Sequence, residues 1–276
     1  MPRIEISTFD TDDIPFGKMI NEEQNWLMTD ADWSRLVELG EECILKATVD
    51  GEGAGMVGAV PYDRMAYVHS MLVRPKFRRM GVATALLREC TLRLKERGVP
   101  TIKLDAEQGV DPLYESLGFE KEWSSHKFLG YGRPERITAT KVEKRDLDSV
   151  IRYDREVTGV DRYRALSLLY EGSHIALMIQ DQEVQGYLLA RPGRGRVEVG
   201  PLVADSVSMA RELILSLMGT APNHRLRMFV PGHNGEAITM LNEVGMRCVD
   251  SPSRMFMGER FVESPNVFVM MSPEKG

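Results

Sequence analysis

The chain has 276 residues, of which 35 are Lys or Arg and 41 are Asp or Glu, so its formal net charge is −6. At roughly 150 residues per domain, this length predicts about two domains. Hydrophobic residues make up 43% and charged residues 28%, which is typical of a globular protein and excludes a disordered or fibrous one. The acidic balance argues against a nucleic-acid partner, because phosphate backbones are bound by basic surfaces.

Neither a membrane segment nor a secretion signal is predicted. No apolar run approaches the roughly 18 residues needed to cross a bilayer, and the acidic start of the chain is unlike a signal peptide. The cysteines Cys43, Cys90 and Cys248 are far apart and odd in number, which excludes a disulfide framework and a CxxC metal site. The histidines show no ligand spacing, so no metal is expected. We therefore expect a cytoplasmic protein with no membrane partner.

The first half of the chain predicts an α/β domain. In chain order we expect helices at residues 15–25 and 30–39, strands at 43–49, 55–62 and 65–73, a helix at 81–97, a strand at 101–105, a helix at 111–117 and a strand from Phe119. Asp50-Gly51 supplies a hairpin turn. The strand–helix–strand succession makes strands 65–73 and 101–105 parallel neighbours.

The second half repeats this order, which indicates a duplicated fold. Gly130-Tyr-Gly-Arg-Pro134 breaks both helix and strand, so we expect domains at 1–133 and 134–276. Strands are predicted at 137–142, 174–180, 184–191, 196–203, 225–230 and from Met246, with helices at 146–155, 162–170, 206–218 and 234–243. Leu117-Gly118-Phe119 corresponds to Val244-Gly245-Met246. Both halves should be α/β domains with a mixed sheet.

The strongest chemical signal is the turn between strand 65–73 and helix 81–97. Its sequence, Arg78-Arg-Met-Gly81-Val-Ala83, places a glycine where the first N–H groups of a helix lack partners. Those donors and the helix dipole form an anion site. Gly81 and Ala83 leave room for a pyrophosphate, and Arg78 and Arg79 add positive charge. A basic helix start with a tight-turn glycine is the alternative, and spacing alone does not decide between the two.

These residues resemble the R/Q-x-x-G-x-G/A signature of the GNAT superfamily of acyl-CoA-dependent N-acetyltransferases. Leu72-Val73-x-Pro75 precedes the signature and Leu113-Tyr114-x-x-x-Gly118-Phe119 follows it, as in that superfamily. The resemblance implies a sheet that splays open between strands 65–73 and 101–105, with acetyl-CoA as the cosubstrate in the opening. The residues that would then bind it are Met71, Leu72, Val73, Arg78, Arg79, Met80, Gly81, Val82, Ala83 and Thr84.

Over its whole length the chain is similar to the YitH-like acetyltransferases, which carry a second, divergent acetyltransferase-like domain. Segments that carry this resemblance include Gly109-Val-Asp-Pro-Leu-Tyr114 and Gly159-Val-Asp161-Arg162. The second half departs from the pattern, since it lacks the R-x-x-G-x-G/A turn and has Asp205 at the matching corner. Leu241 stands where a tyrosine would be. We therefore expect residues 134–276 not to bind CoA and to contribute to the acceptor site.

Acetyl transfer to an amine requires a base, because alkylamines are mostly protonated at neutral pH, and an acid for the departing thiolate. The resemblance makes Tyr114 the acid, with an aromatic packed under the cofactor as its alternative role. His69 is the first candidate base, because histidine titrates near neutrality, and a histidine buried in the sheet is the alternative. Strand alternation predicts His69 and Met71 on one face. Glu107 is the second candidate base.

The acceptor site is expected to draw on several positions implied by the resemblance. These are Trp26, Glu107, Asp161, Arg162 and Glu198. An Arg–carboxylate pair can hold a ligand by two hydrogen bonds, or it can be a structural ion pair.

The resemblance, together with these residues, implies an N-acetyltransferase that acts on a small-molecule primary amine in a direct ternary complex. No cysteine lies beside the cofactor turn, which disfavours a covalent intermediate. An acetyltransferase for protein lysines or N-termini, and an acyl-CoA-binding sensor without catalysis, are the alternatives.

Overall fold

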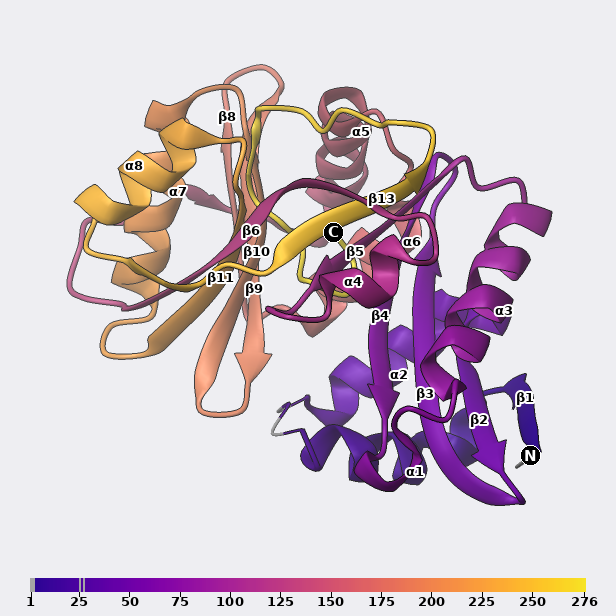
Figure 1. The fold of residues 1–276 in the computed structure, drawn as a ribbon. Helices are drawn as coiled ribbons and strands as arrows, with labels where there is room; N and C mark the ends of the chain where they lie inside the picture. Colours follow the sequence, from indigo (N-terminus) through magenta and orange to yellow (C-terminus); the bar gives the residue numbers. More distant parts are fainter. Residues whose placement is uncertain (1–2, 25, 27) are drawn as a thin grey trace. The chain divides into compact units, whose positions relative to one another are not determined.

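A computed structural model describes residues 3–24, 26 and 28–276 and shows two compact units (Figure 1). The first unit comprises Met1–Lys121 and Met255–Phe261, and the second comprises Glu122–Arg254 and Val262–Gly276. Within the part of the chain that is described, no helix combines the length and apolar character needed to cross a membrane.

This division differs from the predicted boundary between residues 133 and 134. β6 (Glu120–Tyr131) continues without a break past Lys121, so the glycines and proline at 130–134 end a strand rather than a domain. Residues 255–261, which include most of β13 (Ser253–Gly258), belong to the first unit. Periodicity does not reveal this membership, because it reports which face of a strand is buried but not which strand lies beside it.

The first unit is a mixed sheet with helices on both faces. Its elements before β6 are β1 (Ile4–Thr8), α1 (Ile14–Glu22), α2 (Asp30–Gly40), β2 (Leu45–Val49), β3 (Glu52–Pro61), β4 (Met65–Val73), α3 (Val82–Glu96), β5 (Thr101–Ala106) and α4 (Asp111–Glu115). The strands lie in the order β1-β2-β3-β4-β5-β13. β4 and β5 are parallel, as predicted, and β1 to β4 are antiparallel. β1 was not predicted, and position 25 at the end of the first predicted helix lies outside the described residues.

Each face of this sheet has its own core. α3 covers one face, where Leu86 and Leu87 pack with the strand residues Ala47 and Val57. α1 and α2 cover the other face, where Trp33 stacks on Phe9 with ring centroids 6.1 Å apart. The three- and four-residue spacing of the apolar side chains in α3 explains why a single stripe of this helix is buried.

The second unit repeats this layout. After β6 its elements are β7 (Thr140–Lys141), α5 (Leu147–Thr158), α6 (Tyr163–Gly172), β8 (Ile175–Gln180), β9 (Val184–Gly193), β10 (Arg196–Ala204), α7 (Val207–Thr220), β11 (Arg225–Pro231), α8 (Gly235–Glu243), β12 (Arg247–Asp250) and β14 (Val267–Val269). The strand order is β6-β11-β10-β9-β8-β7, with β12 on β6 and β14 on β10. β10 and β11 are parallel across α7, as β4 and β5 are across α3. Of the strand predicted at 137–142, only Thr140–Lys141 is observed as a strand, β7.

Residues 255–261 complete the first unit. β13 pairs with β5, and Met255 is fully buried in the core beneath α3. The amide of Glu259 donates to the carbonyl of Pro100 at 2.9 Å, and the Lys103 ammonium donates to the carbonyl of Phe261 at 3.0 Å. The segment therefore covers the edge of β5, which would otherwise present unpaired backbone groups.

Replacing Met255 by Ala should lower the free energy of unfolding by about 2–5 kcal/mol, the usual cost of a cavity in a well-packed core. The side chain is 0% exposed, so its removal leaves space that water does not fill. Urea titration followed by circular dichroism measures the change. Met257→Ala is the matched control, since Met257 is only half-buried and should cost less. Equal losses for the two variants would contradict the role assigned to Met255.

Candidate active site

The sheet of the first unit opens where β4 and β5 part. The two strands pair from Met65 opposite Thr101 to Val68 opposite Leu104, and among the described residues this register goes no further. β4 continues to residue 73 while paired with β3 on its other side. The backbone of residues 71–73 thus has no strand beside it on the β5 side, and its amides can bind a ligand there.

A β-bulge in β4 decides which face each side chain takes. One residue of β3 faces two residues of β4, and Ser70 has a positive φ of 50°. Val68 before the bulge and Met71 after it both pack in the core beneath α3. His69 alternates with Val68 and points to the opposite face. The prediction that His69 and Met71 share a face is therefore wrong, because the extra residue reverses the alternation.

The turn that follows β4 leads into an α3 whose N-terminus has no side-chain cap. Gly81 is the N-cap residue, with a left-handed φ of 86°, and no side chain among the described residues bonds to the first turn. A Cβ added at Gly81 would meet no atom within 4 Å, so the space in front of the helix is open. Exposed N–H groups and the positive end of the helix dipole make this position suited to an anion.

Arg78 and Arg79 flank this turn and are both exposed. The Arg78 guanidinium donates to the carbonyl of Val73 at 3.2 Å and to Oε1 of Gln24 at 3.1 Å. These bonds hold its positive charge between the end of β4 and the start of α3. Arg79 has a positive φ of 63°, which residues other than glycine rarely adopt. The turn is therefore held in a specific shape by its surroundings. Met80 and Gly81 are exposed, Val82 is buried, and Ala83 and Thr84 are half-buried.

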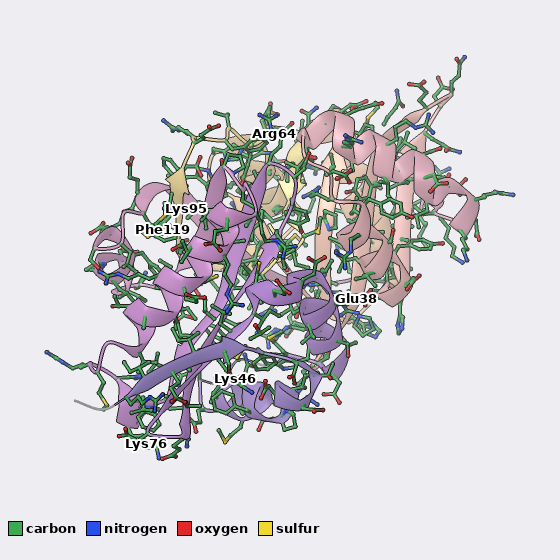
Figure 2. The ribbon with its side chains drawn as sticks, turned by 90° about the vertical axis from the view of Figure 1, so that its right-hand side faces the viewer. Glu38, Lys46, Arg64, Lys76, Lys95 and Phe119 are labelled. Carbon is green, nitrogen blue, oxygen red and sulfur yellow. The ribbon has the colours of Figure 1, made fainter. Side chains whose placement is uncertain are left out.

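Tyr114 lies in α4, the helix that follows β5. Its ring packs edge-on against Phe119, labelled in Figure 2, with centroids 5.9 Å apart. Gly118, with φ 92°, ends the helix and lets the amide of Phe119 bond back to the carbonyl of Tyr114. The motif Leu-Tyr-x-x-x-Gly-Phe therefore encodes the turn that ends α4. Burial, with a smaller contribution from the charge of Glu107, raises the pKa of Tyr114 to about 12.

His69 is buried against a glycine of the neighbouring strand. Its Nδ1 lies 3.0 Å from Oγ of Ser70. A Cβ at Gly58, its cross-strand partner, would lie 2.4 Å from Cε1 of the imidazole, so only glycine leaves room for the ring. Gly58 and Ser70 were not among the predicted residues, although a glycine inside a strand signals a close approach of this kind.

The remaining candidates of the first unit lie on different surfaces. Trp26 is half-buried and packs with the cluster beneath α1 and α2, which also holds Leu72. Because Leu72 and His69 are both opposite the α3 face, Trp26 borders the same side of the sheet as His69. Glu107 is exposed just beyond β5.

The candidates of the second unit are held in ion pairs. Arg162, 7% exposed, makes a bidentate pair with Asp154, which also accepts from the hydroxyl of Tyr187. Asp161 accepts from the amide of Tyr163 at the start of α6. Arg162 is therefore part of a buried structural network, one of the two alternatives for the predicted arginine–carboxylate pair.

Glu198 is held in the same way. Its two carboxylate oxygens accept from Arg196 at 2.6 Å and from Arg227 at 2.8 Å, and it is 7% exposed. With both oxygens engaged by arginines, Glu198 is available to a ligand only if these pairs break.

The corner of the second unit that matches the α3 turn is closed to anions. Ser206 caps α7, since its hydroxyl accepts from the amide of Met209. Asp205 lies just before it and accepts from the hydroxyl of Tyr153 at 2.8 Å. The groove between α7 and α8, about 490 Å³, is lined by Glu236, Glu243 and Arg211, and Arg211 is paired with Glu243. Negative charge and a filled cap distinguish this corner from the open, basic one. Among the described residues, no three His, Cys, Asp or Glu side chains gather as a metal site.

Known families match both halves of the chain. Residues 7–119 match the family described as Acetyltransferase (GNAT) family, and residues 150–268 match the Acetyltransferase (GNAT) domain. The uncharacterized N-acetyltransferase YitH of Bacillus subtilis (strain 168) is 22% identical over 236 residues, covering 83% of each chain. The holothin acyltransferase of Pseudoalteromonas sp. (strain SANK 73390) is 22% identical over 243 residues, covering 86% of this chain and 82% of its own.

A solved structure has the same fold over nearly the whole chain. The crystal structure of an assigned acetyltransferase from Pyrococcus horikoshii superposes with a TM-score of 0.86 at 24% identity, covering 99% of this chain and 96% of that one. The repeated layout of two units is thus shared with a known protein.

Proposed function

The chain is a GNAT-superfamily acetyltransferase with two such domains in tandem, and from this premise we propose that its first unit transfers an acetyl group from acetyl-CoA to a primary amine of a small molecule. The observation that carries the proposal is the uncapped N-terminus of α3 beside the open edge of β4. A pyrophosphate would accept from the N–H groups at residues 81–84, with Arg78 and Arg79 nearby. The amides of the pantetheine arm would pair with the backbone at 71–73.

We expect one CoA per chain in a calorimetric titration, because the α7 corner of the second unit carries Asp205 and a serine cap instead of an open turn. Arg79→Glu should weaken CoA binding by about tenfold or more, since it places a negative charge beside the phosphates. Arg211→Glu, at a half-exposed arginine on α7, is the control and should leave the affinity unchanged. A stoichiometry of two would contradict the expectation that the second unit does not bind CoA.

The chemistry requires three events at the thioester. The amine nitrogen attacks the carbonyl carbon and forms the C–N bond, while a base takes the amine proton. The C–S bond then breaks. CoA leaves as a thiolate, which needs a hydrogen-bond or proton donor. We assign the donor role to Tyr114. A phenol with a pKa of about 12 stays protonated at neutral pH. It is a weaker acid than an ordinary thiol, so it stabilises the leaving thiolate chiefly by a hydrogen bond.

Tyr114→Phe should lower kcat by about 10²-fold and change CoA affinity by less than about threefold, since only the hydroxyl is lost. The raised pKa keeps the hydroxyl protonated, so activity should not fall between pH 7 and 10 through ionisation of Tyr114. Steady-state kinetics at several pH values measure both effects. An unchanged kcat would refute the assigned role.

Two residues compete for the role of base. His69 is buried beside β3 at the part of β4 that leaves β5, and Glu107 is exposed at the end of β5. A base acts only when deprotonated, so the rate falls as pH drops through its pKa. His69→Gln should remove this acidic limb and lower kcat by about 10²-fold or more, while Glu107→Gln keeps the limb. The reverse pattern in the pH–rate profiles would assign the base to Glu107.

Direct transfer agrees with the positions of the cysteines. Cys43 and Cys90 are both buried, and burial raises the pKa of each thiol, so neither is a ready nucleophile. Cys248 belongs to the second unit. We therefore propose that amine and acetyl-CoA are bound together when the acetyl group moves.

A thiol-release assay with acetyl-CoA against small amines, polyamines, aminoglycosides, arylalkylamines and peptides tests the acceptor class. We expect turnover with a small primary amine and none with its N-acetylated form, because the attacking lone pair is then lost. Turnover confined to peptides would replace the proposal by protein acetylation. CoA binding without thiol release for any amine would replace it by an acyl-CoA sensor.

A further inference from the structure

We propose that the second unit contains a separate site for a small anion, a carboxylate or phosphate group attached to an apolar body. The site is a pocket of about 740 Å³ at one end of the sheet. Its walls come from the end of β6, the start of β8, the hairpin between β9 and β10, the end of α7 and the start of β11. This volume is within the range of small-molecule sites. The inference does not depend on the function proposed for the first unit.

Charge is the first argument. The basic side chains that line the pocket are His174, Arg191, Arg196, His224 and Arg225, and none of the lining residues is acidic. The chain as a whole carries more acidic than basic residues, with a net charge of −6. A concentration of one sign of charge in a concave surface attracts ligands of the opposite sign.

The arginines differ in how much of their charge is available. Arg196 shares Glu198 with Arg227, so its charge is partly neutralised. Arg191 is 5% exposed and its guanidinium lies 3.5 Å from the carbonyl of Gly200, which fixes it in the wall. Arg225 is exposed and forms no ion pair with any residue that the structure describes. Arg225 is therefore the side chain best placed to make a charge-assisted bond to a ligand.

The rest of the wall supplies apolar surface. The pocket is lined by Ile175 of β8, Val197 of β10 and Pro192 near the end of β9. Tyr131, at the end of β6, also lines it and is 63% exposed. A bare inorganic ion would leave this surface in water. A molecule with a hydrocarbon or aromatic part would cover it, at about 25 cal/mol for each Å² removed from water.

The position separates this pocket from the cofactor-like corner of the same unit. β10 and β11 are parallel, and the pocket lies where both strands begin, whereas α7 starts where β10 ends. Thr220 and Ala221 at the end of α7 bring the negative end of a helix dipole to one wall. That partial charge is smaller than a full guanidinium charge, so the exposed Arg225 still makes the pocket attractive to an anion.

Phenyl phosphate, benzoate, benzyl alcohol and benzylamine are the probes, titrated into the full-length protein by calorimetry. We expect the two anions to bind and the neutral and cationic probes not to bind. The tighter of the two anions identifies phosphate or carboxylate as the preferred group. Binding of benzylamine as tight as that of phenyl phosphate would overturn the proposal.

Variants assign the binding to this pocket. Arg225→Glu and Arg225→Met should weaken binding of the anionic probe by about tenfold or more, and Arg225 is exposed, so both variants should fold. Arg211→Glu, at a half-exposed arginine in the groove between α7 and α8, should change it by less than about twofold. Unchanged binding in both Arg225 variants, or loss of binding in Arg79→Glu, would place the anion elsewhere and overturn the proposal.

Discussion

The parallel pairing of β4 with β5 stops after Val68 and Leu104, and the opening in the sheet of the first unit depends on that stop. A bulge at Ser70 breaks the regular alternation of β4 just beyond the last pair. The strand then leaves its neighbour while β3 still holds it on the other side. The backbone N–H and C=O groups of residues 71–73, which would pair with β5 in a closed sheet, therefore remain available on that side. After a short turn, α3 begins with a first turn that no side chain caps. A ligand with amides and an anionic end fits this order of donors and acceptors.

The two units repeat one fold but treat the start of the crossover helix in opposite ways. In the first unit, a left-handed glycine and exposed arginines leave the helix N-terminus open to anions. In the second, the hydroxyl of Ser206 occupies that position and Asp205 adds negative charge. In the second unit, buried polar side chains form ion pairs with one another, such as Arg162 with Asp154. The fold alone therefore says little about chemistry, which is set by a few residues at one corner.

Features specified by local sequence could be predicted, and features specified by distant partners could not. The hairpin at Asp50-Gly51 and the turn before α3 follow from residues close together in the chain. The bulge at Ser70 could not be predicted, because β4 is largely buried on both faces and so shows no polar–apolar alternation that an extra residue could shift. The arginines that hold Glu198, the room that Gly58 leaves for His69, and the placement of residues 255–261 all depend on strand neighbours that periodicity does not identify.

The return of residues 255–261 to the first unit has a consequence during synthesis. A ribosome adds roughly 5–20 residues per second, so on the order of ten seconds elapse between residue 121 and residue 261. Throughout this time the nascent first unit lacks Met255 in its core and has an uncovered edge on β5. Such an edge can pair with other chains. The protein should therefore rely on chaperones more than its size suggests, because the first unit is complete only after residues 255–261 have been made.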